Sequence, residues 1–269
     1  MQLGISTSAF YGRWETEEAA RAIADMHLDC AEVFLQTISE YELPFAAMVR
    51  RNLGDTPCVS MHPAGIQFEN QMFGRSARQR ADAFDLYRRS LDAGQTLGAQ
   101  TYVYHGRSTP LLSPLPFQLE ANLDVLGLMN EEAKRRGMIV AWENVYWCQL
   151  TDCSRIREVK RALPDIRFTL DIKQAMRAGA DPIEMAREMG ESLVHVHICD
   201  WDENRKLCLP GEGQFDFRKL IDTLKDIGYN GPVIMEPYLA MISSDNALEA
   251  SIAYMQRVLQ YNSHNDHKE

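Results

Sequence analysis

Short apolar runs alternate with longer segments of helical period along the whole sequence. The apolar runs predict strands over 1–6, 30–36, 58–62, 101–105, 138–145, 167–172, 193–198 and 233–238. Helices are expected over 44–52, 76–97, 117–136, 154–163, 216–227 and 246–261, and others begin at Thr16 and Asp181. Eight strands, each followed by a helix, predict a (β/α)8 TIM barrel, with a single domain over 1–262 and a frayed tail over 263–269. A doubly wound open sheet is the alternative, but the glycine-rich turn expected after one of its early strands is missing.

Charge and composition narrow the class of partner. The 269 residues carry a net charge of −10, which gives the chain no electrostatic reason to bind nucleic acid. The start, MQLGISTSAF, lacks the basic region and apolar run of a signal peptide, and no apolar run is long enough to span a membrane. Six scattered cysteines favour reduced thiols in a cytoplasmic protein. We therefore expect a small-molecule substrate and neither a nucleic-acid nor a membrane partner; the sequence leaves a homo-oligomer open.

One segment, LVHVHICDWDENRKLCLPGEGQFDF over 193–217, has the order of an α/β active-site segment: apolar strand, polar loop, capped helix. His195 and His197 are two residues apart and therefore face the same side of the strand. His197 lies nearer the C-terminal end, whereas His195 lies one layer deeper and is interpreted as a core histidine. Asp216 is a good helix N-cap.

Polar side chains also follow the apolar runs of other strands, at the end where (β/α)8 enzymes place their chemistry. The residues at these positions are His62, His105, Glu143, Asp171, Lys173, His197 and Glu236. A buried charge is costly unless it is paired or bound to a metal, and three converging carboxylates would repel one another. We therefore predict that Glu143, Asp171, His197 and Glu236 bind one divalent metal ion. Oxygen donors favour Mn²⁺ first, or Mg²⁺, and the imidazole leaves Co²⁺ and Zn²⁺ open. An ordinary ion pair is the alternative for each carboxylate taken alone.

Five residues are predicted to contact the substrate: His62, His105, Lys173, Arg205 and Glu212. Lys173 lies two residues after Asp171, so its side chain points into the same cavity if the strand continues. Pairing with one of the carboxylates is the alternative for Lys173. A solvated loop charge is the alternative for Arg205.

These motifs together resemble the xylose isomerase-like TIM barrel superfamily, in particular its sugar phosphate isomerase/epimerase family. The resemblance covers nearly the whole chain. It rests on Glu143-Asn144, Leu170-Asp171, His197-x-x-Asp200, Pro210-Gly211-Glu212-Gly213 followed by Asp216, and Met235-Glu236. The resemblance implies that the residues at 143, 171, 197 and 236 bind one divalent metal. It also implies that Glu143 and Glu236 are the catalytic acid/base pair, because the epimerases exchange protons through both glutamates.

The sequence departs from these relatives at two places. The epimerases, and the more distant endonuclease IV, have a histidine three residues after the sixth-strand aspartate, where this chain has Gln174. The endonuclease has an Asp-x-His pair in the seventh loop, where this chain has Arg205-Lys-Leu207. Missing zinc ligands and the acidic net charge argue against DNA repair. The missing histidine also weighs against a standard ketohexose 3-epimerase.

The resemblance implies proton transfer next to a carbonyl through a metal-stabilised enediolate. We therefore expect a divalent-metal-dependent isomerase or epimerase that acts on a sugar or cyclitol. Glu212 and Asp216 place acidic groups where barrels often bind phosphate, which favours an unphosphorylated substrate. A metal-dependent lyase or dehydratase acting on keto-sugars or keto-glycosides is the alternative. A non-catalytic sugar-binding barrel is less favoured because all four ligand positions are filled.

Overall fold

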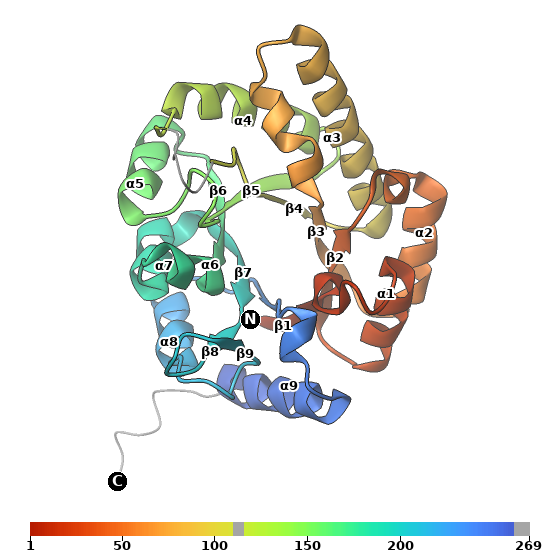
Figure 1. Ribbon diagram of the computed structural model, residues 1–269, viewed down its shortest axis with the longest axis vertical. Helices are drawn as coiled ribbons and strands as arrows, with labels where there is room; N and C mark the ends of the chain where they lie inside the picture. Colours follow the sequence, from red (N-terminus) through yellow and green to blue (C-terminus); the bar gives the residue numbers. More distant parts are fainter. Residues whose placement is uncertain (110–115, 261–269) are drawn as a thin grey trace.

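The computed structural model describes residues 1–109 and 116–260. Within them, eight parallel strands close into a barrel that a ring of helices surrounds (Figure 1). The barrel strands are β1 (Gln2–Ser6), β2 (Cys30–Leu35), β3 (Cys58–Pro63), β4 (Thr101–Tyr104), β5 (Ile139–Glu143), β6 (Arg167–Asp171), β7 (Leu193–Ile198) and β10 (Pro232–Met235). Each strand pairs with its neighbours along the chain, and β10 closes the barrel against β1. The predicted (β/α)8 fold is confirmed.

The helices lie around the strands (Figure 1). They are α1 (Thr16–Asp25), α2 (Leu43–Asn52), α3 (Ala77–Leu97), α4 (Leu119–Lys134), α5 (Cys153–Ala162), α6 (Ile172–Ala178), α7 (Pro182–Met189), α8 (Phe217–Asp226) and α9 (Asp245–Gln260). In α3, the Ser76 side chain caps the first turn, and Gly98 ends the helix with a φ of 85°, which glycine adopts without a steric penalty. Its buried residues pack toward α2 and β3. The prediction of a helix over 76–97 is confirmed.

The end of β6 differs from the prediction. We expected the strand to continue through Ile172, but it ends at Asp171, and α6 begins at the next residue. The Asp171 carboxylate caps this helix by accepting a hydrogen bond from the Gln174 N–H at 2.9 Å. Lys173 therefore lies in the first turn of a helix and not on a strand.

The loop after β7 is held by one carboxylate. It contains a short antiparallel ribbon of β8 (Asp200–Trp201) and β9 (Leu207–Cys208). The Asp200 side chain accepts hydrogen bonds from the backbone N–H groups of Trp201, Gly211, Gly213 and Phe215 at 2.8 to 3.1 Å. Asp216 then caps α8 by accepting from the Lys219 N–H, as the sequence predicts. The loop is thus anchored at the C-terminal end of β7.

All six cysteines are free thiols, in agreement with the prediction. No helix in the described ranges is both long and apolar enough to cross a membrane. The predicted boundary between the barrel and a frayed tail, at residue 262, lies outside the described residues.

Candidate active site

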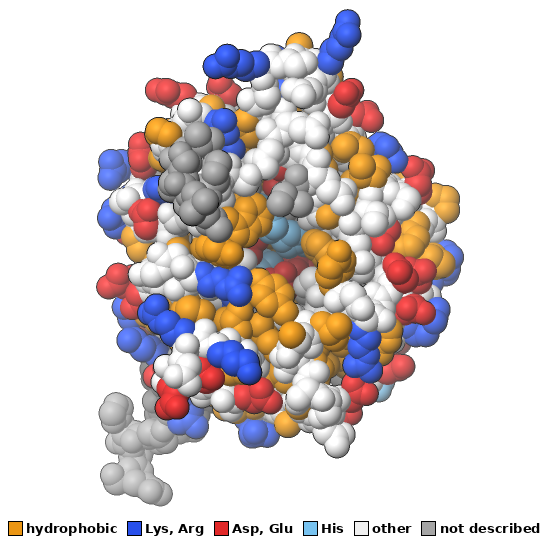
Figure 2. All heavy atoms as spheres, in the orientation of Figure 1, with side chains coloured by type: hydrophobic (Ala, Val, Ile, Leu, Met, Phe, Trp, Pro, Cys, Tyr) orange, Lys and Arg blue, Asp and Glu red, His pale blue; other side chains and the backbone are white. Residues whose placement is uncertain are grey.

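A cavity of about 600 Å³ opens at the C-terminal ends of the barrel strands. Figure 2 shows histidine and acidic side chains at its floor, with hydrophobic side chains around its mouth. The lining residues include Ser8, Tyr11, Phe34, Gln36, His62, Gln67, His105, Glu143, Trp147, Lys173, Gln174, Glu236 and Tyr238. Five of the polar residues predicted at the strand ends therefore line one cavity: His62, His105, Glu143, Lys173 and Glu236.

The structure brings together the four residues that we predict as metal ligands. Glu143, Asp171, His197 and Glu236 each offer a ligand atom, and these atoms all lie within 4.8 Å of one another. Three elements end at this point: β5 at Glu143, β6 at Asp171 and β7 just after His197. Asn144 fixes the β6 end, because its side chain donates to the Asp171 carbonyl and accepts from the Asp171 N–H, both at 2.8 Å.

The donor set fits a divalent cation. Glu143 Oε2 and Asp171 Oδ2 are buried, and their neighbours are the His105 and His62 imidazoles and the Lys173 ammonium, at 3.1 to 3.6 Å. Buried carboxylate oxygens of this kind are usually hydrogen-bonded or bound to a cation. Three carboxylates with one imidazole suit ions such as Mn²⁺ and Mg²⁺ and do not exclude Zn²⁺. Burial, together with the charges of Glu143 and Glu236, raises the pKa of Asp171 despite the nearby Lys173, so a cation here would relieve repulsion among the carboxylates.

A buried glutamate that the sequence analysis missed sits beneath His197. Glu32 Oε2 lies 3.1 Å from His197 Nε2 and 2.9 Å from His195 Nε2, and Ser60 donates to the same oxygen. A carboxylate at Nε2 fixes a proton there, so Nδ1 is the nitrogen that would bind a cation in place of its own proton. Without a cation, the surrounding carboxylates outweigh burial and hold the pKa of His197 well above its ordinary value, so Nδ1–H donates to Glu143. Nδ1 lies 3.2 Å from Glu143 Oε1 and 3.5 Å from Glu236 Oε2, and both of these glutamates line the cavity. His195 is buried, as predicted, but it belongs to this network and not to the apolar core.

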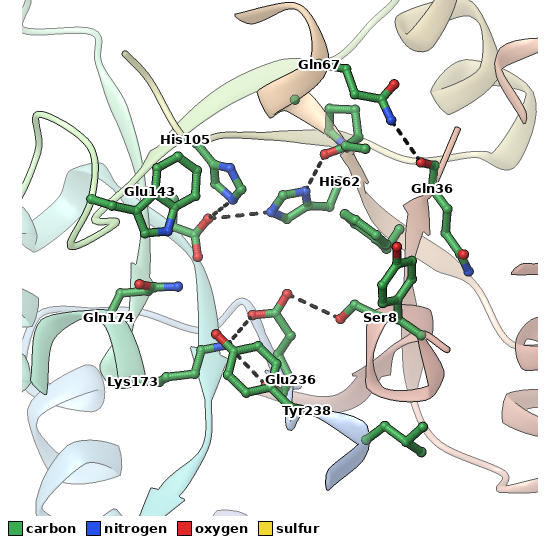
Figure 3. Close-up of a pocket in the computed structure, with 17 residues that line it drawn as sticks. Ser8, Gln36, His62, Gln67, His105, Glu143, Lys173, Gln174, Glu236 and Tyr238 are labelled. Atoms are coloured by element: carbon green, nitrogen blue, oxygen red, sulfur yellow. Dashed lines mark hydrogen bonds and ion pairs between the residues drawn. The ribbon is translucent and has the colours of Figure 1, made fainter. Parts of the chain in front are cut away.

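Two further histidines lie on the other side of Glu143 (Figure 3). His62 Nδ1 donates to the Pro63 carbonyl at 2.9 Å, which turns Nε2 toward Glu143 Oε2 at 3.6 Å. His105 Nε2 lies 3.1 Å from the same oxygen. Burial opposes a charged His62, but hydrogen bonding and attraction to Glu143 outweigh it and raise its pKa to about 9. Burial and the proximity of His62 lower the pKa of His105. One charged and one neutral imidazole therefore face the cavity.

The two glutamates of the site have different partners. Burial disfavours ionisation of Glu143, but hydrogen bonds from His105, His197 and His62 outweigh it and hold its pKa well below the ordinary value. Glu236 also keeps a lowered pKa against burial, chiefly because of the Lys173 and His197 charges. The Lys173 ammonium contacts Glu236 Oε2, and the Ser8 hydroxyl donates a hydrogen bond to Glu236 Oε1 at 3.3 Å. Both side chains are carboxylates near neutral pH.

The predicted substrate contacts divide into two groups. His62, His105 and Lys173 line the cavity, although Lys173 reaches it from α6. Arg205 is exposed and lines a separate groove beside Trp201 and Lys219. Glu212 is exposed and accepts a hydrogen bond from the Leu209 N–H. The structure therefore does not place Arg205 or Glu212 at the cavity wall.

Several cavity residues carry no signal that the sequence analysis used. Ser8 and Tyr11 come from the turn after β1, and Gln36 and Gln67 come from loops after β2 and β3. Tyr238 follows β10 and lies over the Lys173 ammonium, 4.6 Å from ring centroid to Nζ. These positions follow strand ends, but each is a common surface residue whose sequence neighbours do not mark it.

Comparisons with known proteins agree with this architecture. An uncharacterized protein of Mycobacterium leprae is 25% identical, with 94% of each chain covered. The structure of a D-psicose 3-epimerase in the presence of D-fructose superposes with a TM-score of 0.77 at 18% identity, covering 97% of this chain and 100% of that one. The structure of the IolI protein with a bound zinc atom gives a TM-score of 0.77 at 16% identity, covering 98% and 100%.

Sequence identities of 16 to 18% to these solved structures show that the fold is shared. Membership of a family is shown by a family model that matches most of the chain. The model described as xylose isomerase-like TIM barrel matches residues 20–258, which include β2 to β10 and all four candidate ligands. With a closed eight-stranded barrel in the described residues and its polar cluster at the strand ends, the chain belongs to the xylose isomerase-like TIM barrel family.

Proposed function

We propose that this protein is a divalent-metal-dependent isomerase or epimerase of an uncharged sugar or cyclitol. The observation that carries the proposal is the convergence of four ligand atoms within 4.8 Å of one another, two of them on glutamates that line the cavity. Solved structures with this fold include a D-psicose 3-epimerase, and another contains a bound zinc atom, which supports both parts of the proposal.

Glu143, Asp171, His197 and Glu236 would hold the cation, and we favour Mn²⁺ because three of the four ligands are carboxylates. A bound divalent cation supplies a Lewis acid that stabilises negative charge developing on substrate oxygens. Glu32 keeps the His197 ring in the orientation that presents Nδ1.

Glu143 and Glu236 are the proposed proton carriers. Both are held as carboxylates, and both line the cavity, Glu143 at the end of β5 and Glu236 just after β10 (Figure 3). A carboxylate in contact with a substrate C–H can remove its proton, and a positioned general base contributes about 10²–10⁴-fold to the rate. His62 and His105 lie beside Glu143 and would donate hydrogen bonds to substrate oxygens on that side.

The cavity wall favours a neutral polyol over a sugar phosphate. Among the described residues that line the cavity, Lys173 is the one permanent cation, and it is already paired with two carboxylates. The carboxamides of Gln36, Gln67 and Gln174 offer neutral hydrogen-bonding groups. Aromatic rings of Tyr11 and Trp147 supply apolar surface of the kind that packs against a sugar ring.

The test is solvent hydrogen exchange. The metal-depleted protein would be reconstituted with Mn²⁺ and incubated in deuterated water with a panel of ketoses and inososes. We expect deuterium to enter the carbon next to the carbonyl, with loss of exchange in Glu143→Gln and after chelation. No exchange with any member of the panel would overturn the proposal. Release of water or an aglycone from keto-sugars or keto-glycosides would identify the lyase or dehydratase alternative instead.

A further inference from the structure

Lys173 makes its contacts with the same oxygen atoms that the candidate metal site would use. Its Nζ lies 3.0 Å from Glu236 Oε2 and 3.4 Å from Asp171 Oδ2, and it also donates to the Glu236 carbonyl at 3.3 Å. The side chain is only 2% exposed. Glu236 Oε2 is also the atom that lies 3.5 Å from His197 Nδ1. The ammonium is therefore in contact with two of the four candidate ligands, and Figure 3 shows it against the Glu236 carboxylate.

The positive charge is unevenly distributed around the three carboxylates. Glu143 is surrounded by three imidazoles, at 3.1 to 3.6 Å. Asp171 and Glu236 instead share the Lys173 ammonium, which has a permanent charge and cannot accept a metal. A divalent cation that binds Asp171 Oδ2 and Glu236 Oε2 must share both oxygens with this ammonium. Charges this close and this deeply buried interact strongly, because little water screens them.

We propose that Lys173 is a resident counter-ion of the metal centre. It holds Asp171 and Glu236 in their ligand positions while no divalent ion is bound, and it lowers the affinity of the site for that ion. This inference rests on the metal site of the proposed function. Lys173 acts here as a positioning residue, through the two carboxylates and not on the substrate.

The two effects of Lys173 have opposite signs, which separates this role from ordinary packing. Without the ammonium, the metal-free protein keeps buried carboxylates that lack their cation, and it becomes less stable. The same loss removes the repulsion felt by an incoming divalent ion, so binding becomes tighter. A side chain that only fills space would weaken both the fold and the binding when it is replaced.

The experiment compares wild type, Lys173→Met and Lys173→Arg. Each protein is stripped with a chelator, its melting temperature is measured, and Mn²⁺ is then titrated by calorimetry at one pH. For Lys173→Met we expect a lower melting temperature without metal and Mn²⁺ binding at least about tenfold tighter than wild type. Lys173→Arg keeps the charge and should bind Mn²⁺ within a few-fold of wild type. Ser8→Ala removes an uncharged partner of the same glutamate, and should change the affinity by less than about threefold.

Each outcome decides a different question. Equal or weaker Mn²⁺ binding by Lys173→Met, with binding by wild type intact, overturns the role of Lys173 and leaves the proposed function standing. No Mn²⁺ binding by any of the proteins overturns both. If Lys173→Met folds only when Mn²⁺ is present, the ion replaces the lost charge and the inference is supported. If it stays unfolded at saturating Mn²⁺, Lys173 acts through packing and the inference fails.

Discussion

Glu32 and Glu69 are both almost completely buried, Glu32 on β2 inside the barrel and Glu69 in the turn after β3, which packs against α3. Glu32 contacts two imidazoles, on His195 and His197. Glu69 accepts a hydrogen bond from the Tyr102 hydroxyl at 3.1 Å, and its other oxygen accepts no hydrogen bond within the described part of the chain.

The pKa values of these two carboxyl groups shift in opposite directions. Burial alone would raise both. For Glu32, the charge of His197 and hydrogen bonds from His195 and His197 overcome burial and hold the pKa well below the ordinary value. For Glu69, burial dominates over weaker attraction to His62 and the Tyr102 hydrogen bond, and the pKa rises to about 8. Burial alone therefore does not decide the charge of these two carboxyl groups; direct contact with the His197 and His195 imidazoles separates Glu32 from Glu69.

The largest expected effect is on stability, from one substitution made at both sites. Glu32→Gln removes a buried negative charge that two imidazoles compensate, and should lower the free energy of unfolding by about 3 kcal/mol. Glu69→Gln replaces a carboxyl group that is neutral below its raised pKa, and should cost less than about 1 kcal/mol at pH 6. Denaturant unfolding of the two metal-free variants at pH 6 measures both values. Equal losses would remove the distinction between the sites.

Glu32→Gln and Glu69→Gln should also differ in their affinity for Mn²⁺. Glu32→Gln weakens the support of His197 Nε2, so we expect Mn²⁺ binding to weaken by about 10- to 100-fold. Glu69→Gln lies behind the cavity wall and should leave the affinity within about twofold of wild type. Calorimetric titration of both proteins is the measurement, and a comparable loss in Glu69→Gln would show that the two networks are coupled.

A third difference concerns pH. The Glu69 pKa is about 8 in the folded protein, against 4.5 as its ordinary value, so the folded state binds this proton more tightly. Its contribution to stability is complete below about pH 4.5 and is lost as the pH rises through 8. Between pH 6 and 7.5 the wild type should lose about 2 kcal/mol more than Glu69→Gln. Glu203→Gln, at an exposed position, is the matched control and should retain the wild-type slope.

The smallest expected effect compares the neutral hydrogen-bond donors of the two carboxyl groups. Ser60 donates to Glu32 at 2.9 Å, and Tyr102 donates to Glu69 at 3.1 Å. Hydrogen bonds to charged groups are the stronger class, so Ser60→Ala should cost about 2 kcal/mol and Tyr102→Phe about 1 kcal/mol at pH 6. Thermal or denaturant unfolding resolves this gap. A greater loss in Tyr102→Phe would mean that Glu69 is ionised.

The strand ends explain why much of the site could be predicted from the sequence. Glu143, Asp171, His197 and Glu236 each follow an apolar run, and a closed parallel barrel brings such positions to one rim. Lys173 was correctly predicted to line the cavity but on the wrong element, because a strand and the first turn of a helix can both direct a side chain inward from a residue after Asp171.

Glu32 and Glu69 could not be found in the same way. Glu32 stands third in the strand Cys30–Leu35, without an end signal, and its partner His195 is 163 residues away. Glu69 lies in a 3-10 turn with no period to mark its buried face. Their importance depends on contacts between distant segments, which exist only once the barrel has closed. Arg205 and Glu212 are the opposite kind of error, because the sequence analysis predicted them at the site and the cavity lining does not include them. A chemically suitable residue in a loop after a strand can still lie away from the cavity.

The Asp200 anchor of the β7–α8 loop has a consequence for how this barrel can diversify. Four backbone N–H groups meet one carboxylate, and a Cβ at Gly213 would lie 2.4 Å from its Oδ1. The shape of the loop base is thus set by Asp200 and its glycines, whereas residues 203–206 at the tip are all exposed. Natural variation or a randomised library could exchange the tip freely without altering the base. None of the described residues of this loop lines the cavity, so such variation would change the outer surface and leave the cavity wall intact.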